Sequence, residues 1–406
     1  MVKHMLSESF RLQYDKQAVL DKLLILAERK FKQRANKYDV DAIFPAENFD
    51  DLFKIGAMAL PVSREWGGLE CSSAYGDADS LWQMTRAIAQ ADLSFARCWE
   101  GHNNALMLID RFADTAQKKR WLTQVVDKGE RWAAWSGEPQ KKLPGQQFNI
   151  GTKIDRVEGG YLLNGNKVFA TSAPGVNWAV LLVSLAGPGG ARDASDGENS
   201  LLMVGCDMSD PSISFDGGWW DPLGMRSTTS YKVIFNNTFI PDEHCLGEGG
   251  EYIASGMQNC FTPHYAVSFL GALEAAYSYA LDMVQSKNCE SDPYVQHHIA
   301  EIKINIETLV LWKNNVENKL IKIDQVDAGI AGNKFRYLSE KLAEDGVKRC
   351  IKICGARGLN KPSHLERIYR DLSIYVQHDN ADHILATIGR EALGIEADTS
   401  FFKIKT

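Results

Sequence analysis

The chain lacks the features that mark membrane, secreted or nucleic-acid-binding proteins. In 406 residues no apolar stretch reaches the ~18 residues that a membrane-spanning helix needs. Its 45 Lys and Arg are outnumbered by 52 Asp and Glu, and no run of five or more like charges occurs. A net charge of −7 gives no attraction for phosphate backbones. We therefore expect a cytoplasmic protein that binds neither nucleic acid nor membranes.

Cysteine is also sparse, with eight residues and no CxxC pair. This excludes the usual patterns of a disulfide framework or a zinc site. Cys350 and Cys354 are one helical turn apart, a spacing that could hold a metal, but there is no second pair of cysteines to complete such a site. We therefore interpret both as core residues. The HDNADH string at 378–383 would spread its ligands around a helix start. No metal site is expected.

The sequence contains neither alternating βαβ units nor GxGxxG, which argues against a Rossmann domain. Instead, an apolar period of three and four holds over residues 1–130, short β-type runs follow over 131–245, and the helical period returns over 246–406. We predict an α+β fold with an N-terminal helical domain, a central antiparallel β domain and a C-terminal four-helix bundle. The four bundle segments are expected at roughly 252–287, 293–322, 329–356 and 379–393.

Two short motifs in the β-type region carry a resemblance. AWSGEP at 134–139 resembles the segment ending in Thr-Glu-Pro that holds the flavin ring in acyl-CoA dehydrogenases, with Gly137 in place of the hydroxyl residue. NGNKVFATS at 164–172 is similar to the Asn-Gly-x-Lys-x-Trp-Ile-Thr-Asn of the same family. In it, Phe169 replaces the tryptophan and Thr171 is unchanged. An isoalloxazine ring needs a flat apolar wall and a few fixed donors, which these residues can supply.

Further motifs extend the resemblance over residues 50–395. WDPLGMRST at 220–228 is similar to the family's Leu-Gly-x-Arg strand pair, in a form closer to the distant branch that includes monooxygenases. CGARGL at 354–359 and LERIYRD at 365–371 look like its glycine loop and its Leu-Glu-Arg-x-x-Arg-Asp. In the family, that loop approaches the flavin diphosphate of a neighbouring subunit. Alternatively, its glycines simply end a helix.

The resemblance implies an FAD-containing homo-oligomer, commonly a tetramer or else a dimer. The cofactor-binding residues implied are Trp135, Ser136, Gly137, Phe169, Thr171, Lys352, Gly355 and Ala356.

The sequence departs from the family at the residue that performs the chemistry. Family dehydrogenases use a glutamate to remove the α-proton of a thioester, and Asp379 stands at that position. The other family location falls on or beside Phe261. His378 is a second candidate base, or a group that assists oxygen chemistry. Alternatively, Asp379 is the N-cap of the last helix. Phe261 and Tyr265 are expected to line the substrate pocket.

Three functions follow from these residues. The first is α,β-dehydrogenation of an acyl thioester, attached to CoA or to a carrier protein, with Asp379 as base and FAD as hydride acceptor. The second is a monooxygenase or oxidase of the same fold, supplied by a flavin reductase and acting on another organic substrate. This alternative needs no α-proton base. The third is a flavin-binding protein without catalysis.

Overall fold

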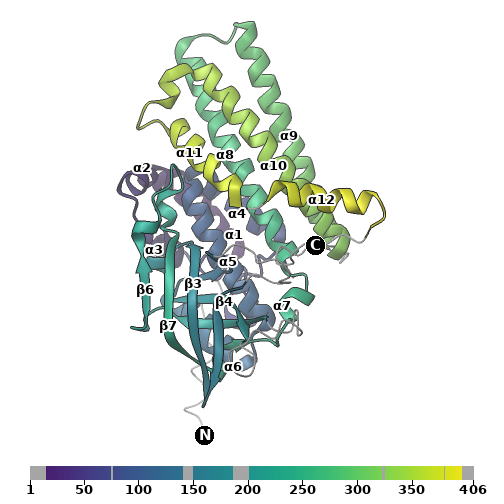
Figure 1. Ribbon diagram of the computed structural model, residues 1–406. Coiled ribbons are helices and arrows are strands. Elements are labelled where there is room, and N and C mark those ends of the chain that lie inside the picture. The colour runs from purple at the N-terminus through teal and green to yellow at the C-terminus, as the bar shows by residue number, and fades with distance from the viewer. Residues whose placement is uncertain are drawn as a thin grey trace.

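The computed structural model describes residues 15–74, 76–139, 150–185, 201–321, 325–378 and 380–395. Along the chain, a helical region comes first, a region of strands follows, and a second helical region comes last. Figure 1 shows the sheet at one end of the molecule and three long helices reaching toward the other. This is the expected order of an N-terminal helical domain, a β domain and a C-terminal helical domain. No helix among the described residues is long and apolar enough to cross a membrane.

The N-terminal domain is a set of helices packed around one central helix. These helices are α1 (Lys16–Leu26), α2 (Lys32–Asp41), α3 (Ala46–Lys54), α4 (Ala78–Ala91), α5 (Leu93–Phe112) and α6 (Thr115–Lys128). A short π-helical stretch, Ala27–Phe31, joins α1 to α2. The apolar pattern at 80–99 is typical of one continuous helix, but the structure divides it at Asp92. The Asp92 side chain caps α5 by accepting a hydrogen bond from the Phe95 amide.

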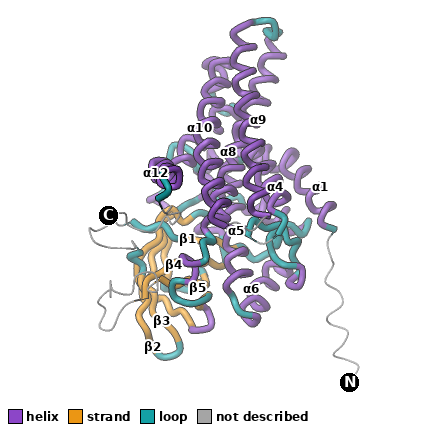
Figure 2. The backbone as a smooth tube through the Cα atoms, turned by 90° about the vertical axis from the view of Figure 1, so that its right-hand side faces the viewer, coloured by secondary structure: helices purple, strands orange, loops and turns teal. Residues whose placement is uncertain are grey.

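Helix α5 is the centre of the molecule. Nearly all its side chains from Leu93 to Asp110 are buried, and in Figure 2 it lies between the strands on one side and α4 and α1 on the other. It contacts β1, α4 and α8. A helix buried on all sides has no solvent face for its polar residues, so those of α5 must find partners inside the protein.

One twisted sheet forms the β domain. Its strands are β1 (Trp132–Trp135), β2 (Lys153–Val157), β3 (Gly160–Ala170), β4 (Trp178–Leu185), β5 (Leu201–Asp207), β6 (Ile213–Asp216), β7 (Tyr231–Pro241) and β8 (Cys245–Leu246). The order is β6-β7-β3-β2-β4-β5-β8, with β1 beside β4. Most pairs are antiparallel, as predicted, but β4 runs parallel to both β1 and β2.

Two glycine-containing stretches in this region, EGG at 158–160 and NGN at 164–166, predict turns between strands, and only the first prediction is confirmed. Glu158 and Gly159 form the predicted hairpin between β2 and β3. The NGN at 164–166 is instead an irregularity within the long strand β3. There Gly165 has a φ of 137°, and a Cβ at this residue would lie 2.6 Å from the Thr152 Cα. Glycine lets β3 pass close to the neighbouring backbone rather than turn away from it.

The C-terminal domain is built on three long helices. Its helices are α7 (Glu251–Ala254), α8 (Gln258–Lys287), α9 (Pro293–Ile321), α10 (Gln325–Cys354), α11 (His364–Tyr375) and α12 (Ala381–Ala392). Helix α11 is absent from the predicted segments. The interpretation of Asp379 as the last N-cap is wrong, because Asn380 caps α12 by accepting from two backbone amides. Cys350 and Cys354 lie in the core, as predicted.

Candidate functional site

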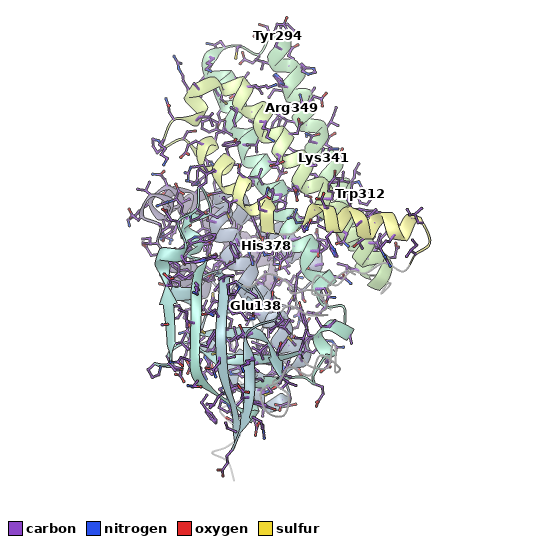
Figure 3. All side chains as sticks on the ribbon, viewed as in Figure 1. Glu138, Tyr294, Trp312, Lys341, Arg349 and His378 are labelled. Atoms are coloured by element: carbon purple, nitrogen blue, oxygen red, sulfur yellow. The ribbon has the colours of Figure 1, made fainter. Side chains whose placement is uncertain are left out.

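A cavity of about 630 Å³ opens where the sheet meets α5, α8 and α11. Figure 3 shows His378 and Glu138 on either side of this junction. Eight of the residues expected from sequence line it: Trp135, Ser136, Gly137, Phe169, Thr171, Phe261, Tyr265 and His378. They come from strands and helices that are up to 243 residues apart, and the fold brings them to one cavity.

The other expected residues lie elsewhere. Lys352, Gly355 and Ala356 are exposed where α10 ends, and Arg349, just before them, lies near the far end of the bundle from His378 (Figure 3). Gly355 follows α10 with a φ of 68°, so the interpretation as a helix-ending glycine is confirmed. Asp379 lies outside the described residues.

A buried ion pair joins the two flavin-type motifs. Lys167 Nζ donates to Glu138 Oε1 at 2.5 Å and to the Leu182 carbonyl at 2.7 Å. The Lys167 side chain is fully buried, and burial lowers its pKa. Glu138 also accepts from the Thr152 hydroxyl at 2.8 Å. The ion pair therefore fixes the chain leaving β1 against β3 and neutralises Glu138.

Gly137 has a steric reason to be glycine. Its carbonyl accepts from the Val168 amide at 3.2 Å. A Cβ at this residue would lie 2.5 Å from the Val168 carbonyl oxygen, closer than real Cβ contacts allow. The departure from the family motif is therefore built into this packing, and the hydroxyl must come from elsewhere.

A chain of hydroxyl groups lines the β-domain side of the cavity. Trp135 Nε1 donates to the Thr171 carbonyl at 3.0 Å. The Ser230 hydroxyl donates to Thr171 Oγ1 at 3.1 Å, and Thr228 Oγ1 lies 2.8 Å from Ser230 Oγ. The hydroxyls of Thr171, Ser230 and Thr228 thus lie together on this side of the cavity.

Strained backbone gathers at the same side. Phe169, Ser172, Met225 and Thr229 all have positive φ, which is uncommon for residues other than glycine. The Phe169 side chain is 62% exposed and meets the Trp219 ring edge-on at 4.8 Å. Such strain is often found at binding sites, where the surrounding structure holds side chains in position.

The helical side of the cavity carries charge and aromatic rings. His378 Nε2 lies 3.4 Å from Arg97 Nη2. The Arg97 guanidinium lies 5.3 Å from the Tyr265 ring centre and 6.0 Å from that of Tyr375. Because a guanidinium only donates, Nε2 is the acceptor in this contact and Nδ1 carries the proton of the neutral ring.

Glu100 lies behind this wall. It is completely buried and accepts from the hydroxyls of Ser268 and Tyr375. Burial raises the pKa of Glu100 to about 7, although Arg97, 3.8 Å away, opposes the shift. A carboxyl group that exchanges its proton near neutral pH thus lies one hydroxyl away from the cavity.

A second buried chain orients Tyr265. The Asn104 amide donates to the Tyr265 hydroxyl at 3.1 Å, and its carbonyl lies 3.1 Å from His264 Nδ1. The other ring nitrogen of His264 lies 2.7 Å from the Thr85 hydroxyl. Burial lowers the pKa of His264 to about 3, so this ring stays neutral and serves as a fixed link.

Sequence reasoning missed several residues of the site, most of them on α5. Arg97, Glu100 and Asn104 follow one another at helical spacing inside a segment rich in apolar residues. Polar side chains in such a segment either pair inside the protein or serve a site, and this signal was available in the sequence.

The C-terminal LERIYRD motif acts structurally. Arg370 pairs with Asp39 on α2 at 2.7 Å and with Glu366 at 2.7 Å. Asp371 accepts from the Met225 amide at 2.5 Å. A Cβ at Gly224 would lie 2.2 Å from the Arg370 carbonyl. The motif therefore clamps the Leu-Gly-Met-Arg loop, and with it part of the cavity wall, onto α11.

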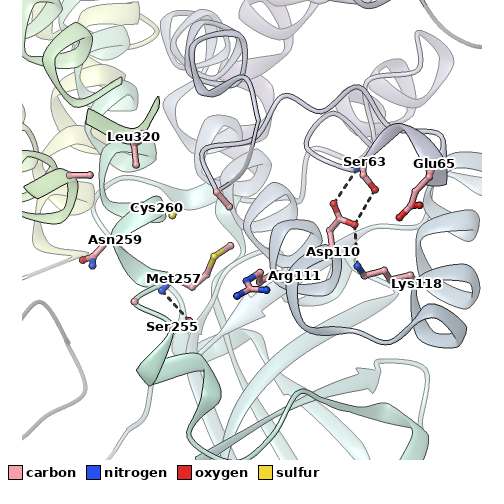
Figure 4. Close-up of a pocket in the computed structure, with 13 residues that line it drawn as sticks. Ser63, Glu65, Asp110, Arg111, Lys118, Ser255, Met257, Asn259, Cys260 and Leu320 are labelled. Carbon is pink, nitrogen blue, oxygen red and sulfur yellow. Dashed lines mark hydrogen bonds and ion pairs between the residues drawn. The ribbon is translucent and has the colours of Figure 1, made fainter. Parts of the chain in front are cut away.

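A second cavity of about 550 Å³ lies beyond the C-terminal end of α5. In it Asp110 accepts from the backbone and hydroxyl of Ser63 and lies 3.8 Å from Lys118 Nζ (Figure 4). Arg111 is exposed and covers the Phe112 ring. Opposite charges are mixed on this wall, which gives it no clear preference for one kind of ligand.

Two family models match the chain. The Acyl-CoA dehydrogenase N-terminal domain matches residues 14–129, and the Acyl-CoA dehydrogenase C-terminal domain matches residues 263–391. Together they cover more than half of the 406 residues.

Individual relatives fall on both sides of the superfamily. The chain is 21% identical to a dibenzothiophene monooxygenase of Rhodococcus erythropolis, over 85% of this chain and 86% of that one. It is also 21% identical to mitochondrial isovaleryl-CoA dehydrogenase of Oryza sativa subsp. japonica, over 86% of each. Among solved structures, the complex of TdsC from a Paenibacillus species with FMN and indole superposes with a TM-score of 0.84 at 20% identity. It covers 95% of this chain and 100% of that one.

Proposed function

The chain belongs to the acyl-CoA dehydrogenase superfamily and is a flavin-dependent oxidoreductase of that fold, and we propose that it is a monooxygenase. In this proposal, reduced flavin, supplied by a separate reductase, would provide two electrons for the activation of molecular oxygen. One oxygen atom enters a small organic substrate, and the other leaves as water with two protons.

The β-domain side of the cavity meets the requirements of a flavin ring. The volume lies within the roughly 300–1,000 Å³ usual for cofactor sites. Trp135 and Phe169 offer aromatic surface, while Thr171 and Ser230 offer hydroxyls. Gln258 Oε1, on the cavity wall, is buried and has no hydrogen-bond partner among the described residues. A ligand with polar ring edges would satisfy it.

The observation that carries the proposal is the kind of groups on the opposite wall. Among the described residues, Glu138 is the one carboxylate lining the cavity, and Lys167 neutralises it. A thioester dehydrogenase needs a carboxylate base within about 3 Å of its substrate. The wall instead presents a histidine, an arginine and three tyrosines. Such donors suit a reaction that stabilises and protonates oxygen.

Each of these groups has a role in the proposal. His378 moves a proton to or from the reacting oxygen. Tyr265, held by Asn104, and Phe261 orient the substrate and exclude water. Arg97 supplies a fixed positive charge beside the imidazole.

We further propose that the flavin is FAD and that the protein is a homo-oligomer. Lys352, Gly355 and Ala356 are exposed and far from the cavity of their own chain, which leaves them available to a neighbouring copy. The TdsC complex contains FMN. If this chain also bound FMN, its flavin site would not need residues from a neighbouring copy. Chromatography of the released flavin, together with the mass of the native assembly, separates the two possibilities.

Dehydrogenation of an acyl thioester is the second candidate. Asp379 directly follows His378, which lines the cavity, and the chain is equally identical to isovaleryl-CoA dehydrogenase. In that reaction Asp379 would be the base.

Two assays on the flavin-loaded protein separate the functions. First, isovaleryl-CoA or butyryl-CoA is added without oxygen, and the flavin absorbance is followed. Second, the flavin is reduced by a reductase, and a small organic substrate, either neutral (indole, dibenzothiophene) or anionic (benzoate, benzenesulfinate), is added with oxygen while the product mass is measured. Incorporation of one oxygen atom without bleaching by thioesters is the expected result. Bleaching by a thioester would overturn the proposal, and neither reaction would indicate a flavin-binding protein without catalysis.

Substitutions assign the residues. His378→Gln should lower product formation at least tenfold while flavin stays bound. Asp379→Asn should leave oxygenation within about threefold, whereas it should abolish any bleaching by thioester.

A further inference from the structure

Arg97 is a buried cation on the cavity wall. It lies in the second turn of α5, is 9% exposed and lines the main cavity. Taking a guanidinium out of water is costly unless its donors find acceptors. Its surroundings therefore indicate what belongs beside it.

Few of the five N–H donors of Arg97 have an acceptor among the described residues. Nη2 faces His378 at 3.4 Å, a long contact, and Nη1 has no hydrogen-bond partner in the described part of the chain. The nearest carboxylate, Glu100, is 3.8 Å from Nη1 and already accepts from two hydroxyls. The guanidinium is therefore left with surplus donors.

The space next to Arg97 is open. An inner compartment of about 80 Å³ shares Arg97, Trp135, Phe261 and Tyr265 with the main cavity. Gly101 forms part of its wall, and a Cβ there would lie 3.8 Å from Arg97 Nη1. The absence of a side chain at Gly101 keeps room beside the guanidinium.

The charge of Arg97 is not cancelled by its neighbours at neutral pH. Glu100 faces Arg97, Tyr375, Arg336 and Cys98, and Arg97 also faces Tyr265 and His378. Burial raises the pKa of Glu100 to about 7, so this carboxyl is partly protonated there. The wall thus keeps an excess of positive charge on the substrate side of the cavity.

We propose that the substrate is a small organic oxyanion, a carboxylate or a sulfinate, whose oxygens accept hydrogen bonds from the Arg97 guanidinium. Its apolar part lies between Phe261 and Tyr265, which line the same space. A guanidinium matches a two-oxygen anion in geometry as well as in charge. This inference rests on the proposed function and names its substrate class.

Binding to the oxidised, flavin-loaded protein tests it without any turnover. The probes are benzoate and benzenesulfinate, with benzamide as the neutral analogue of benzoate, and binding is read from the flavin absorbance and by calorimetry. Benzoate or benzenesulfinate should bind at least tenfold more tightly than benzamide. The stronger of the two identifies the anion.

Variants at Arg97 locate the preference. Arg97→Gln should weaken benzoate binding at least tenfold and benzamide binding less than threefold, and Arg97→Lys should retain part of the preference. The matched control is Arg111→Gln, an exposed arginine on the same helix beside the second cavity (Figure 4). It should leave both affinities unchanged.

Two results would overturn the inference. One is binding of both benzoate and benzenesulfinate no tighter than that of benzamide by the unaltered protein, a result that can be obtained even if no Arg97 variant folds. The other is loss of flavin in Arg97→Gln with the anion preference intact, which would make Arg97 a flavin ligand. An anion preference found together with bleaching by thioesters would reject the monooxygenase and keep the oxyanion site.

Discussion

The β-domain side and the helical side of the cavity differ in how their charged and polar groups are paired. On the β-domain side, the carboxylate and two of the hydroxyls that line the cavity have partners: Glu138 is neutralised by Lys167, and Thr171 is bonded to Ser230. On the helical side, Arg97 has one nitrogen without a hydrogen-bond partner among the described residues, and Glu100 carries a raised pKa. The first side is suited to hold a neutral ring in one place, whereas the second can respond to the charge of what enters.

This difference separates binding from chemistry. Residues resembling the flavin motifs of the superfamily lie on the β-domain side, whereas His378, next to the changed base position, lies on the helical side. Substitutions on the two sides should therefore have different effects. Those on the β-domain side should lower stability and flavin binding, whereas those on the helical side should change the dependence on pH and the binding of anions.

The largest effect is expected from Lys167→Met. The change leaves Glu138, whose side chain is 5% exposed, without its cation, and an unpaired buried charge typically costs about 3–5 kcal/mol. Urea unfolding measures the loss. The control is Lys153→Met on β2, where the Lys153 side chain is 41% exposed and lies 3.9 Å from Asp155. There the expected change is about 0.5 kcal/mol or less. Similar losses in the two variants would show that the buried pair does not hold this side together.

Glu100→Gln tests the charged side through pH. Burial raises the pKa of Glu100 from 4.5 to about 7, so between these values the folded chain holds a proton that the unfolded chain has released. The stability due to Glu100 is therefore full below pH 4.5 and is lost as pH rises through 7.

Relative to the unaltered protein, Glu100→Gln should gain roughly 3 kcal/mol between pH 4.5 and pH 8. Unfolding of both proteins across this range measures the gain, and taking the difference cancels the titration of His102 and His264. A difference that stays constant with pH would mean that Glu100 titrates normally.

Gly137→Ala should act on flavin as well as on the fold. The added Cβ would meet the Val168 carbonyl at 2.5 Å, and backbone cannot move aside easily. We expect a loss of about 1–3 kcal/mol and flavin affinity lowered roughly tenfold. Flavin titration and thermal unfolding report the two effects. Gly389→Ala in α12, with nothing within 4 Å, should instead stabilise by about 0.5–1 kcal/mol.

The sequence predicted more of the cavity residues on the β-domain side than on the helical side. Trp135, Gly137, Phe169 and Thr171 lie in two short motifs, where spacing along the chain constrains position in space. Even there, Gly165 looked like a turn because its close approach to Thr152 depends on a neighbouring strand.

The helical side assembles residues from α5, α8 and the end of α11. His378, Phe261 and Tyr265 were predicted through resemblance, but Arg97 and Glu100 were not. Whether such residues face a cavity depends on which elements pack around α5, and the periodicity of the sequence does not show this. Helix α11 was missed because its polar residues, such as Arg370, are buried in ion pairs rather than exposed.

Ser230→Ala has the smallest expected effect and asks whether the hydroxyl chain serves flavin or only the fold. The change removes the bond to Thr171 Oγ1 and the contact with Thr228 Oγ1, a loss of about 1 kcal/mol in stability. Because Thr171 and Ser230 both line the cavity, flavin affinity should fall severalfold, measured by titration of the flavin-free protein. Ser214→Ala, at an exposed serine of β6, is the control and should change neither quantity. A loss of stability in Ser230→Ala without any change in flavin affinity would assign the hydroxyls to the fold alone and leave flavin recognition to the aromatic residues and the backbone.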